Sequence, residues 1–150
     1  MEEQVLLPVH HVRSRAPEDI AGSEPDAEVS YAVDEDQTHR YAEASGDDHA
    51  IHLDEQVARS AGLPGIIAHG MCLMAFAGRA VLESQGEEDP AAVRRLAVRF
   101  SRPMQPGATL TTRIHSLDRS GAFAFKAVDG DGNAILEDGL AELRGPAESP

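Results

Sequence analysis

The stretch AHGMCLMAFAGRAVLESQG, residues 68–86, is the most hydrophobic helical segment of the chain. Met71, Met74 and Leu82 recur at helical spacing, and further apolar residues occupy the other sides. A helix that is apolar on nearly all sides is a buried one. Its many alanine and glycine residues also predict that a neighbouring element packs close against it. We therefore expect one long helix in the middle of the fold, ended by EEDP at 87–90.

After residue 90 the apolar period changes from that of a helix to that of a strand. In RRLAVRFSRP, residues 94–103, Leu96, Val98 and Phe100 alternate with less apolar residues. Further strands are predicted over 108–117, 122–128 and 134–144. Antiparallel strands in hairpin succession have one face to bury, and the apolar helix is available to cover it. The sequence therefore predicts an α+β fold in which an antiparallel sheet wraps around one helix.

Upstream of the long helix the sequence predicts one strand and two short helices. EVSYAV, residues 28–33, has the composition of a strand. Asp34 is predicted to cap a helix that runs to about Ala44. Gly46 would follow as its C-cap, because glycine adopts the left-handed conformation readily. A second helix over 55–61 would begin at the cap Asp54.

Length and charge limit the classes of protein to which the chain could belong. Its 150 residues suit a single domain, with residues 1–24 as an N-terminal arm and 145–150 as a frayed tail. The net charge of −13 repels phosphate backbones and argues against nucleic acid as the main partner. No apolar run approaches the ~18 residues that a membrane span needs. A single cysteine, Cys72, and no recognisable signal peptide fit a cytoplasmic protein.

The densest cluster of polar side chains is SGDDHAIH, residues 45–52. Asp47 and His52 could converge on one water molecule only if this loop curls, and together they would form a general acid/base pair. The alternative is a solvated polar loop. A second candidate is GIIAHGM, residues 65–71, where Gly70 would let a ligand approach the unpaired N–H groups of a helix start. Its alternative is a small residue at a tight entry into the core.

The two candidates together resemble a known family. The string YAEASGDDHAIHLDEQVARSAGLPGIIAHGM, residues 41–71, resembles the hydratase-2 motif of MaoC-like dehydratases, the R-specific enoyl-CoA hydratases of the hotdog superfamily. The matching residues are Tyr41, Gly46, Asp47, Ile51, His52, Ile66, Ile67, His69 and Gly70. The resemblance covers about residues 28–144 and includes LAVRFSRPMQPGATLTTRI at 96–114. One departure is His49-Ala50, where the family has Asn-Pro.

This resemblance implies a hotdog fold and reversible addition of water to a trans-2-enoyl thioester, of CoA or of an acyl carrier, in fatty acid metabolism. Asp47 and His52 would orient and deprotonate the water, and the N–H of Gly70 would donate a hydrogen bond to the thioester oxygen on which negative charge develops. The residues expected to contact substrate are His49, Ile67, His69, Met71, Met74 and Arg99. Neither a metal nor another cofactor is implied. A homodimer or a larger hotdog assembly is expected, because a single sheet leaves an open edge.

Two other functions remain open at this point. In a hotdog thioesterase, Asp47 would activate water against the carbonyl carbon. A non-catalytic subunit of a related hydratase complex would explain the altered residues His49-Ala50.

Other candidate metal-binding or reactive residues in the sequence are predicted to have structural roles. Asp47, Asp48, His49 and His52 have the chemistry of metal ligands, but adjacent carboxylates point apart in most backbones. DGDGN at 129–133 lacks the glycine and the closing glutamate of a calcium loop, so it is predicted to be a turn. Cys72 is predicted to pack as a small apolar side chain in the buried helix, without a role in chemistry.

Overall fold

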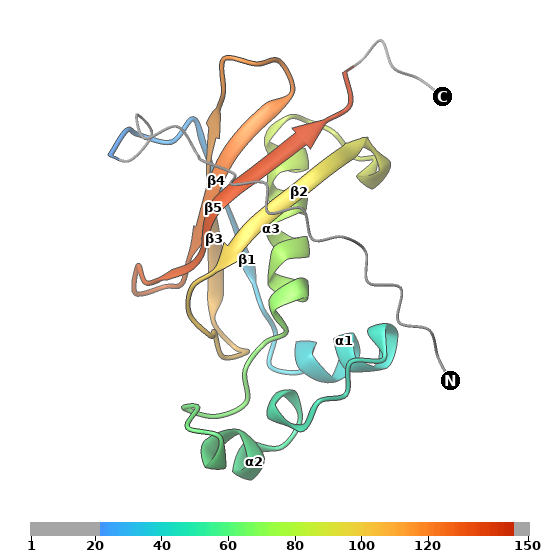
Figure 1. Cartoon of the computed structure of the whole chain (residues 1–150), viewed down its shortest axis with the longest axis vertical. Helices are drawn as coiled ribbons and strands as arrows, with labels where there is room; N and C mark the ends of the chain where they lie inside the picture. Colours follow the sequence, from blue (N-terminus) through green and yellow to red (C-terminus); the bar gives the residue numbers. More distant parts are fainter. Residues whose placement is uncertain (1–21, 146–150) are drawn as a thin grey trace.

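The computed structural model describes residues 22–145, so the expectations for the arm before residue 22 and for residues 146–150 lie outside the described residues. A five-stranded antiparallel sheet has the order β1-β3-β4-β5-β2. Its strands are β1 (Ala27–Ala32), β2 (Val93–Phe100), β3 (Thr109–Ser116), β4 (Ala122–Val128) and β5 (Ala134–Leu143). The long helix α3 (Gly70–Ser84) lies along one face of this sheet (Figure 1). The predicted α+β architecture, a sheet around one helix in the hotdog arrangement, is confirmed.

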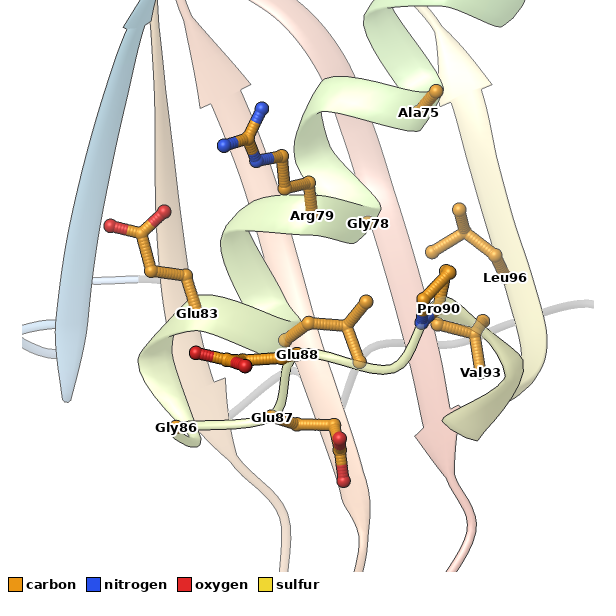
Figure 2. Close-up of a pocket in the computed structure, with 11 residues that line it drawn as sticks. Ala75, Gly78, Arg79, Glu83, Gly86, Glu87, Glu88, Pro90, Val93 and Leu96 are labelled. Atoms are coloured by element: carbon orange, nitrogen blue, oxygen red, sulfur yellow. The ribbon is translucent and has the colours of Figure 1, made fainter.

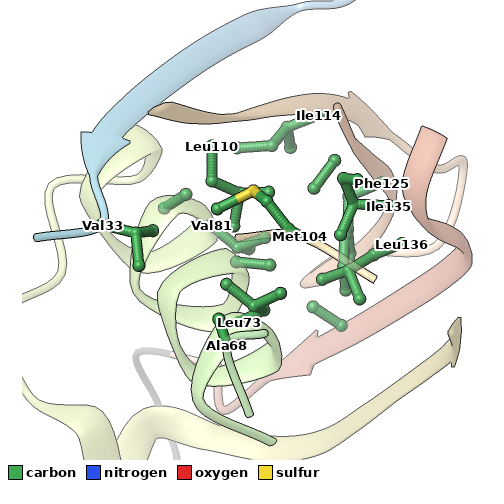
Figure 3. Packing of buried hydrophobic residues seen from close by; sticks show 14 of the residues in the cluster. Val33, Ala68, Leu73, Val81, Met104, Leu110, Ile114, Phe125, Ile135 and Leu136 are labelled. Atoms are coloured by element: carbon green, nitrogen blue, oxygen red, sulfur yellow. The ribbon is translucent and has the colours of Figure 1, made fainter. Parts of the chain in front are cut away.

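The core lies between α3 and the sheet. Leu73 and Val81 of the helix face Leu110 of β3 and Phe125 of β4 within one buried cluster (Figure 3). Small residues on α3 let the helix approach closely, as the composition predicted. A Cβ added at Gly78 would lie 2.9 Å from Cδ2 of Leu96, closer than real Cβ contacts. Helix α3 therefore packs against β2 at van der Waals distance.

Two short helices lie beyond the end of the sheet where α3 begins (Figure 1). Helix α1 (Gln37–Ser45) ends as predicted, with Gly46 in the left-handed region at φ +79°. Helix α2 (Glu55–Ser60) has the predicted cap, because the Asp54 carboxylate accepts from the N–H of Val57 (3.0 Å). Among the described residues, no helix is both long enough and apolar enough to cross a membrane.

The predicted cap of α1 is wrong. The helix begins at Gln37, and its N-terminal neighbour is Asp36, whose side chain makes no capping bond. The guanidinium of Arg40 binds the carboxylates of both Asp34 (3.0 Å) and Asp36 (3.1 Å) instead. The two carboxylates therefore bind the side chain of Arg40, four positions into the helix region, and Asp36 does not cap the helix.

The DGDGN segment forms the predicted turn between β4 and β5. The Asp129 carboxylate accepts from the N–H groups of Asp131 (3.0 Å) and Asn133 (2.9 Å). Its oxygens therefore stabilise the turn itself.

Candidate active site

His52 is buried beside the segment that leads into α3. After Gly46 the chain curls through a short 3-10 turn, Ala50–His52, and leaves the His52 side chain only 7% exposed. Nδ1 of His52 lies 2.7 Å from the backbone oxygen of Ile67. Because a carbonyl oxygen can only accept, Nδ1 carries the hydrogen, and in the neutral ring Nε2 keeps the lone pair. This contact assigns Nε2 as the nitrogen that can take a proton.

The curled loop brings Asp47 close to His52. One carboxylate oxygen of Asp47 and one ring nitrogen of each of His52 and His69 lie within 4.8 Å of one another. Asp47 itself is exposed, so its carboxylate reaches the histidines from the solvent side. A carboxylate and an imidazole at this separation can share one water molecule. The solvated-loop alternative does not describe this geometry, because two of the three groups are buried.

A pocket of about 260 Å³ opens beside His52 at the start of α3. His52 and Gly70 both line it, while Asp47 does not. The N–H groups of the first helical turn have no partner within the helix and carry partial positive charge. A Cβ on Gly70 would lie 2.9 Å from Cε1 of Phe100, so glycine lets this ring close over the helix start. The remaining lining residues are Ile67, Ala68, Leu73, Ser101, Arg102, Pro103, Met104, Ile135 and Leu136.

Only some of the residues predicted to contact substrate line this pocket. Ile67 lines it. His49 is exposed, with its ring centroid 6.3 Å from that of His52. Met71 is 59% exposed and Met74 is half-buried, and neither lines the pocket, because Leu73 occupies the position on the helix that faces it.

Arg99 does not face the pocket either. Its guanidinium forms ion pairs with Glu137 (3.0 Å) and Asp138 (2.8 Å) of the neighbouring strand β5. These two carboxylates, Asp138 first, raise the pKa of Arg99 above its usual value. Arg102, which follows Arg99 in the segment RRLAVRFSRP, lines the pocket instead. The sequence alone could not show which of the two arginines lines the pocket, because the acidic partners of Arg99 lie 38 and 39 residues away from it.

His69 is the N-cap of α3 and is almost completely buried, at 2% exposure. Its Nε2 lies 2.9 Å from the backbone oxygen of Asp47. Its ring stacks on that of His52, with centroids 3.8 Å apart and planes 22° apart. His69 therefore lies behind the pair and does not line the pocket. Asp47, His52 and His69 have the ligand types of a metal site, and one nitrogen of each ring is bonded to a backbone carbonyl.

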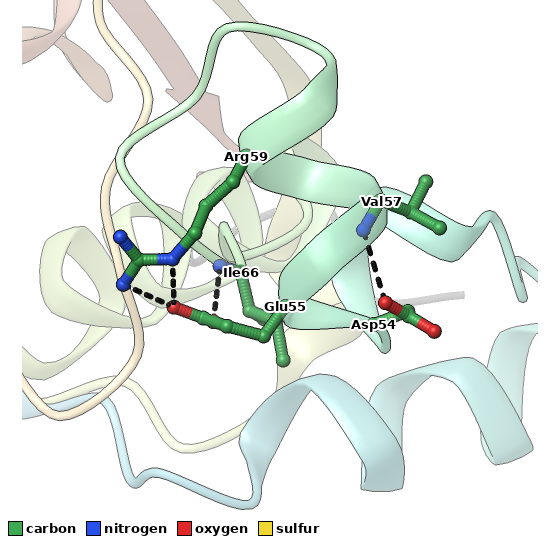
Figure 4. A network of polar contacts seen from close by, with 5 residues as sticks. All are labelled: Asp54, Glu55, Val57, Arg59 and Ile66. Atoms are coloured by element: carbon green, nitrogen blue, oxygen red, sulfur yellow. Dashed lines mark hydrogen bonds and ion pairs between the residues drawn. The ribbon is translucent and has the colours of Figure 1, made fainter.

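Helix α2 holds the segment that contacts His52, a role that the sequence did not indicate. The Glu55 carboxylate accepts from the N–H of Ile66 (3.0 Å) and from Nη2 of Arg59 (2.7 Å) (Figure 4). The N–H of Ile66, followed by Arg59, lowers the pKa of the Glu55 carboxyl. The next residue is Ile67, whose carbonyl orients His52. Glu55 is thus linked to the imidazole by two hydrogen bonds, one from the N–H of Ile66 to Glu55 and one from His52 to the carbonyl of Ile67.

Cys72 lies in the first turn of α3 and is buried, as predicted for a filler residue. Burial raises the pKa of its thiol, so the reactive thiolate is disfavoured.

A second and larger cavity, of about 770 Å³, lies at the other end of α3. Figure 2 shows it between the outer side of that helix, near Ala75 and Gly78, and Leu96 of β2.

Comparisons with known proteins show the family to which this chain belongs. Residues 17–136 match the family described as MaoC like domain. 3-Hydroxyacyl-thioester dehydratase Y of Mycobacterium tuberculosis is 36% identical over 135 residues, which are 87% of this chain and 46% of that protein. Peroxisomal multifunctional enzyme type 2 of Drosophila melanogaster is 44% identical over 87 residues, 58% of this chain and 14% of that protein. The chain spans less than half the length of these curated relatives.

Solved structures of MaoC-like proteins are also similar to this chain. A MaoC-like dehydratase from Phytophthora capsici superposes with a TM-score of 0.78 at 32% identity, covering 84% of this chain and 44% of that chain. An (R)-hydratase from A. caviae superposes with a TM-score of 0.69 at 18% identity, covering 83% of this chain and 97% of that chain. The second likeness shows that the hotdog fold is shared.

Proposed function

Because the chain belongs to the MaoC-like domain family, we propose that it is an (R)-specific enoyl-thioester hydratase that adds water reversibly to a trans-2-enoyl thioester. The observation that carries this proposal is one pocket lined by both His52 and the first residue of α3, with the Asp47 carboxylate within 4.8 Å of the histidine.

In the proposed reaction a water molecule lies between the Asp47 carboxylate and Nε2 of His52. The pair removes one proton while the water oxygen attacks Cβ of the substrate. Electrons from the double bond move to the thioester oxygen, where the N–H of Gly70 and the helix start stabilise the charge. The same pair returns a proton to Cα, so the product is the 3-hydroxyacyl thioester. An amide donor of this kind lowers such a barrier by about 2.7–4 kcal/mol, and positioned acid/base groups contribute about 10²–10⁴ in rate.

We propose that the substrate carries a short acyl chain. Leu73, Ile135 and Leu136 form apolar walls of the pocket that His52 lines. Its volume of about 260 Å³ lies below the range of about 300–1,000 Å³ usual for small-molecule sites. Crotonyl thioesters therefore suit it better than long-chain ones.

We propose Arg102, in place of Arg99, as the contact for the substrate's phosphate groups. Nη1 of Arg102 donates to the neutral amide of Asn133 (3.2 Å), and among the described residues no carboxylate forms an ion pair with it. Arg99 is already neutralised by two carboxylates. Asp129 interacts electrostatically with Arg102, but within the described part of the chain no direct ion pair holds this cation. It can therefore attract the anionic end of a thioester even though the whole chain carries a net charge of −13.

We further propose that the protein acts in the cytoplasm as a homodimer in which a second copy covers the cavity between α3 and β2. Strand β2 lies at the edge of the sheet, and such an edge offers unpaired backbone groups. The adjacent cavity of about 770 Å³ is lined partly by apolar residues, including Ala75, Val93 and Leu96 (Figure 2). A single, buried cysteine is compatible with a reducing compartment.

The test is incubation of the whole chain with crotonyl-CoA. Hydration removes the conjugated double bond, releases no free thiol and gives the (R)-3-hydroxybutyryl product on chiral analysis. Release of free thiol would support a thioesterase instead. Neither change, across enoyl-CoA chain lengths, would support the non-catalytic alternative.

A further inference from the structure

We propose that His69 is a positioning residue, which holds the catalytic pair in place through a hydrogen bond to the backbone of Asp47. This inference rests on the function proposed above and assigns to His69 a role different from contact with substrate.

The hydrogen bond has a fixed direction. Nε2 of His69 lies 2.9 Å from the backbone oxygen of Asp47, and a carbonyl oxygen can only accept, so Nε2 donates. The bond joins residues that are 22 positions apart, from the start of α3 to the curled loop. Ile51 and His52 of the same loop also bind Ile67, but the other hydrogen bonds of Asp47 itself are local. The N–H of Asp47 donates to Ser45 (3.1 Å), and the N–H of His49 donates to the Asp47 carboxylate (3.4 Å). His69 therefore ties the exposed carboxylate to the rigid part of the fold.

The ring of His69 is itself held firmly. It stacks on His52 with centroids 3.8 Å apart, and the Tyr41 ring lies 4.7 Å from it at an angle of 49°. With 2% exposure it has little freedom to turn. One side chain thus contacts the face of the His52 ring and the backbone of Asp47 at once. A small shift of His69 would change the separation of the two catalytic groups.

Packing alone does not account for an imidazole at this position. Nδ1 of His69 is buried and has no hydrogen-bond partner among the described residues. A buried polar atom without a partner costs free energy, and a phenyl ring would fill similar space without that cost. The Nε2–H group is the feature that an imidazole supplies and a phenyl ring lacks. The geometry therefore favours a role for the donor to Asp47.

A matched pair of variants separates this donor from simple space filling. Gln and Met have similar size and flexibility, but only Gln carries an amide N–H that can reach the Asp47 carbonyl. We expect kcat for crotonyl-CoA hydration to fall roughly 100-fold in His69→Met, since a misplacement of about 1 Å can cost that much. We expect His69→Gln to retain most of the lost rate. KM should change little in either variant, because His69 does not line the pocket.

Each outcome decides the proposal, provided that rates are normalised to folded protein measured by circular dichroism. Equal kcat values in His69→Gln and His69→Met would overturn it, whether both are fast or both are slow. If His69→Met does not fold, His69→Phe replaces it, because the phenyl ring keeps the stack on His52 and lacks the donor. A wild-type protein that does not hydrate crotonyl-CoA would overturn the proposed function and this inference with it. An active wild type with equal variants would overturn only the inference.

Discussion

At the scale of single residues, two backbone carbonyls decide which nitrogen does the chemistry. The carbonyl of Ile67 fixes the hydrogen of His52 on Nδ1, and that of Asp47 fixes the hydrogen of His69 on Nε2. The two stacked imidazoles therefore have opposite tautomers, and only His52 lines the pocket. A histidine at position 52 in the opposite tautomer would lose its bond to Ile67 and would turn its basic nitrogen toward that carbonyl.

These tautomers can be observed directly by long-range ¹H–¹⁵N nuclear magnetic resonance of the histidine rings. We expect the spectra to show His52 protonated at Nδ1 and His69 protonated at Nε2 when the rings are neutral. His52→Ala and His69→Gln, each lacking one ring, assign the signals. Finding His52 protonated at Nε2 would contradict the assignment of the basic nitrogen.

The assignment of Arg102, and not Arg99, as the contact for the substrate's phosphate groups gives a second prediction at this scale. Replacing Arg102 with Gln removes the cation at the pocket, so KM for crotonyl-CoA should rise about 2- to 5-fold, as expected for a solvent-exposed charge contact. KM for the phosphate-free N-acetylcysteamine thioester should not change. The matched control is Arg99→Gln, which removes an arginine already paired with Glu137 and Asp138. A larger effect of Arg99→Gln than of Arg102→Gln on KM for crotonyl-CoA would reverse the assignment.

At the scale of secondary structure, local patterns predicted most elements but not the pocket. The apolar periods indicated α3 and the strands because alternation and helical spacing are properties of neighbouring residues. The cap of α1 was wrong because Arg40 recruits both aspartates through contacts that no capping pattern describes. Ile135 and Leu136 reach the pocket only because the chain places β5 between β4 and β2. The family motif predicts that Asp47 and His52 act together, whereas their spacing alone is also compatible with a solvated polar loop.

The Glu55 contact gives a prediction about helix α2. The lowered pKa of this carboxyl means that its charged form is favoured by the fold, so this stabilisation is present above the ordinary value of 4.5 and is lost as the pH falls through the lowered value. Glu55→Gln keeps an oxygen that can accept from Ile66 but removes the charge. We expect its Tm to lie below that of the wild type at pH 7, with a difference that shrinks at pH values well below 4.5.

Glu43→Gln serves as the control, because Glu43 is exposed on α1. Its Tm should follow that of the wild type at both pH values. A Tm difference for Glu55→Gln that persists unchanged in acid would show that the charge of Glu55 does not stabilise its contacts with Ile66 and Arg59.

At the scale of the whole molecule, the edge strand β2 and the cavity beside α3 form the face that we assign to the homodimer. Ala75 is exposed on this face, so Ala75→Arg would introduce a bulky charge there without disturbing the core. We expect sedimentation velocity to give a dimer for the wild type and a monomer for Ala75→Arg. Lys126→Ala, exposed on β4, should remain dimeric. A monomeric wild type, or a dimer that Ala75→Arg leaves intact, would contradict this assignment.

The most direct test of the whole account is the value of kcat for crotonyl-CoA hydration by Asp47→Asn and His52→Ala, compared with the wild type. Each change removes one member of the acid/base pair, so each variant should lose at least about 100-fold in kcat while its circular dichroism spectrum stays that of the wild type. Hydration at an undiminished rate in both folded variants would show that water is activated elsewhere in the molecule.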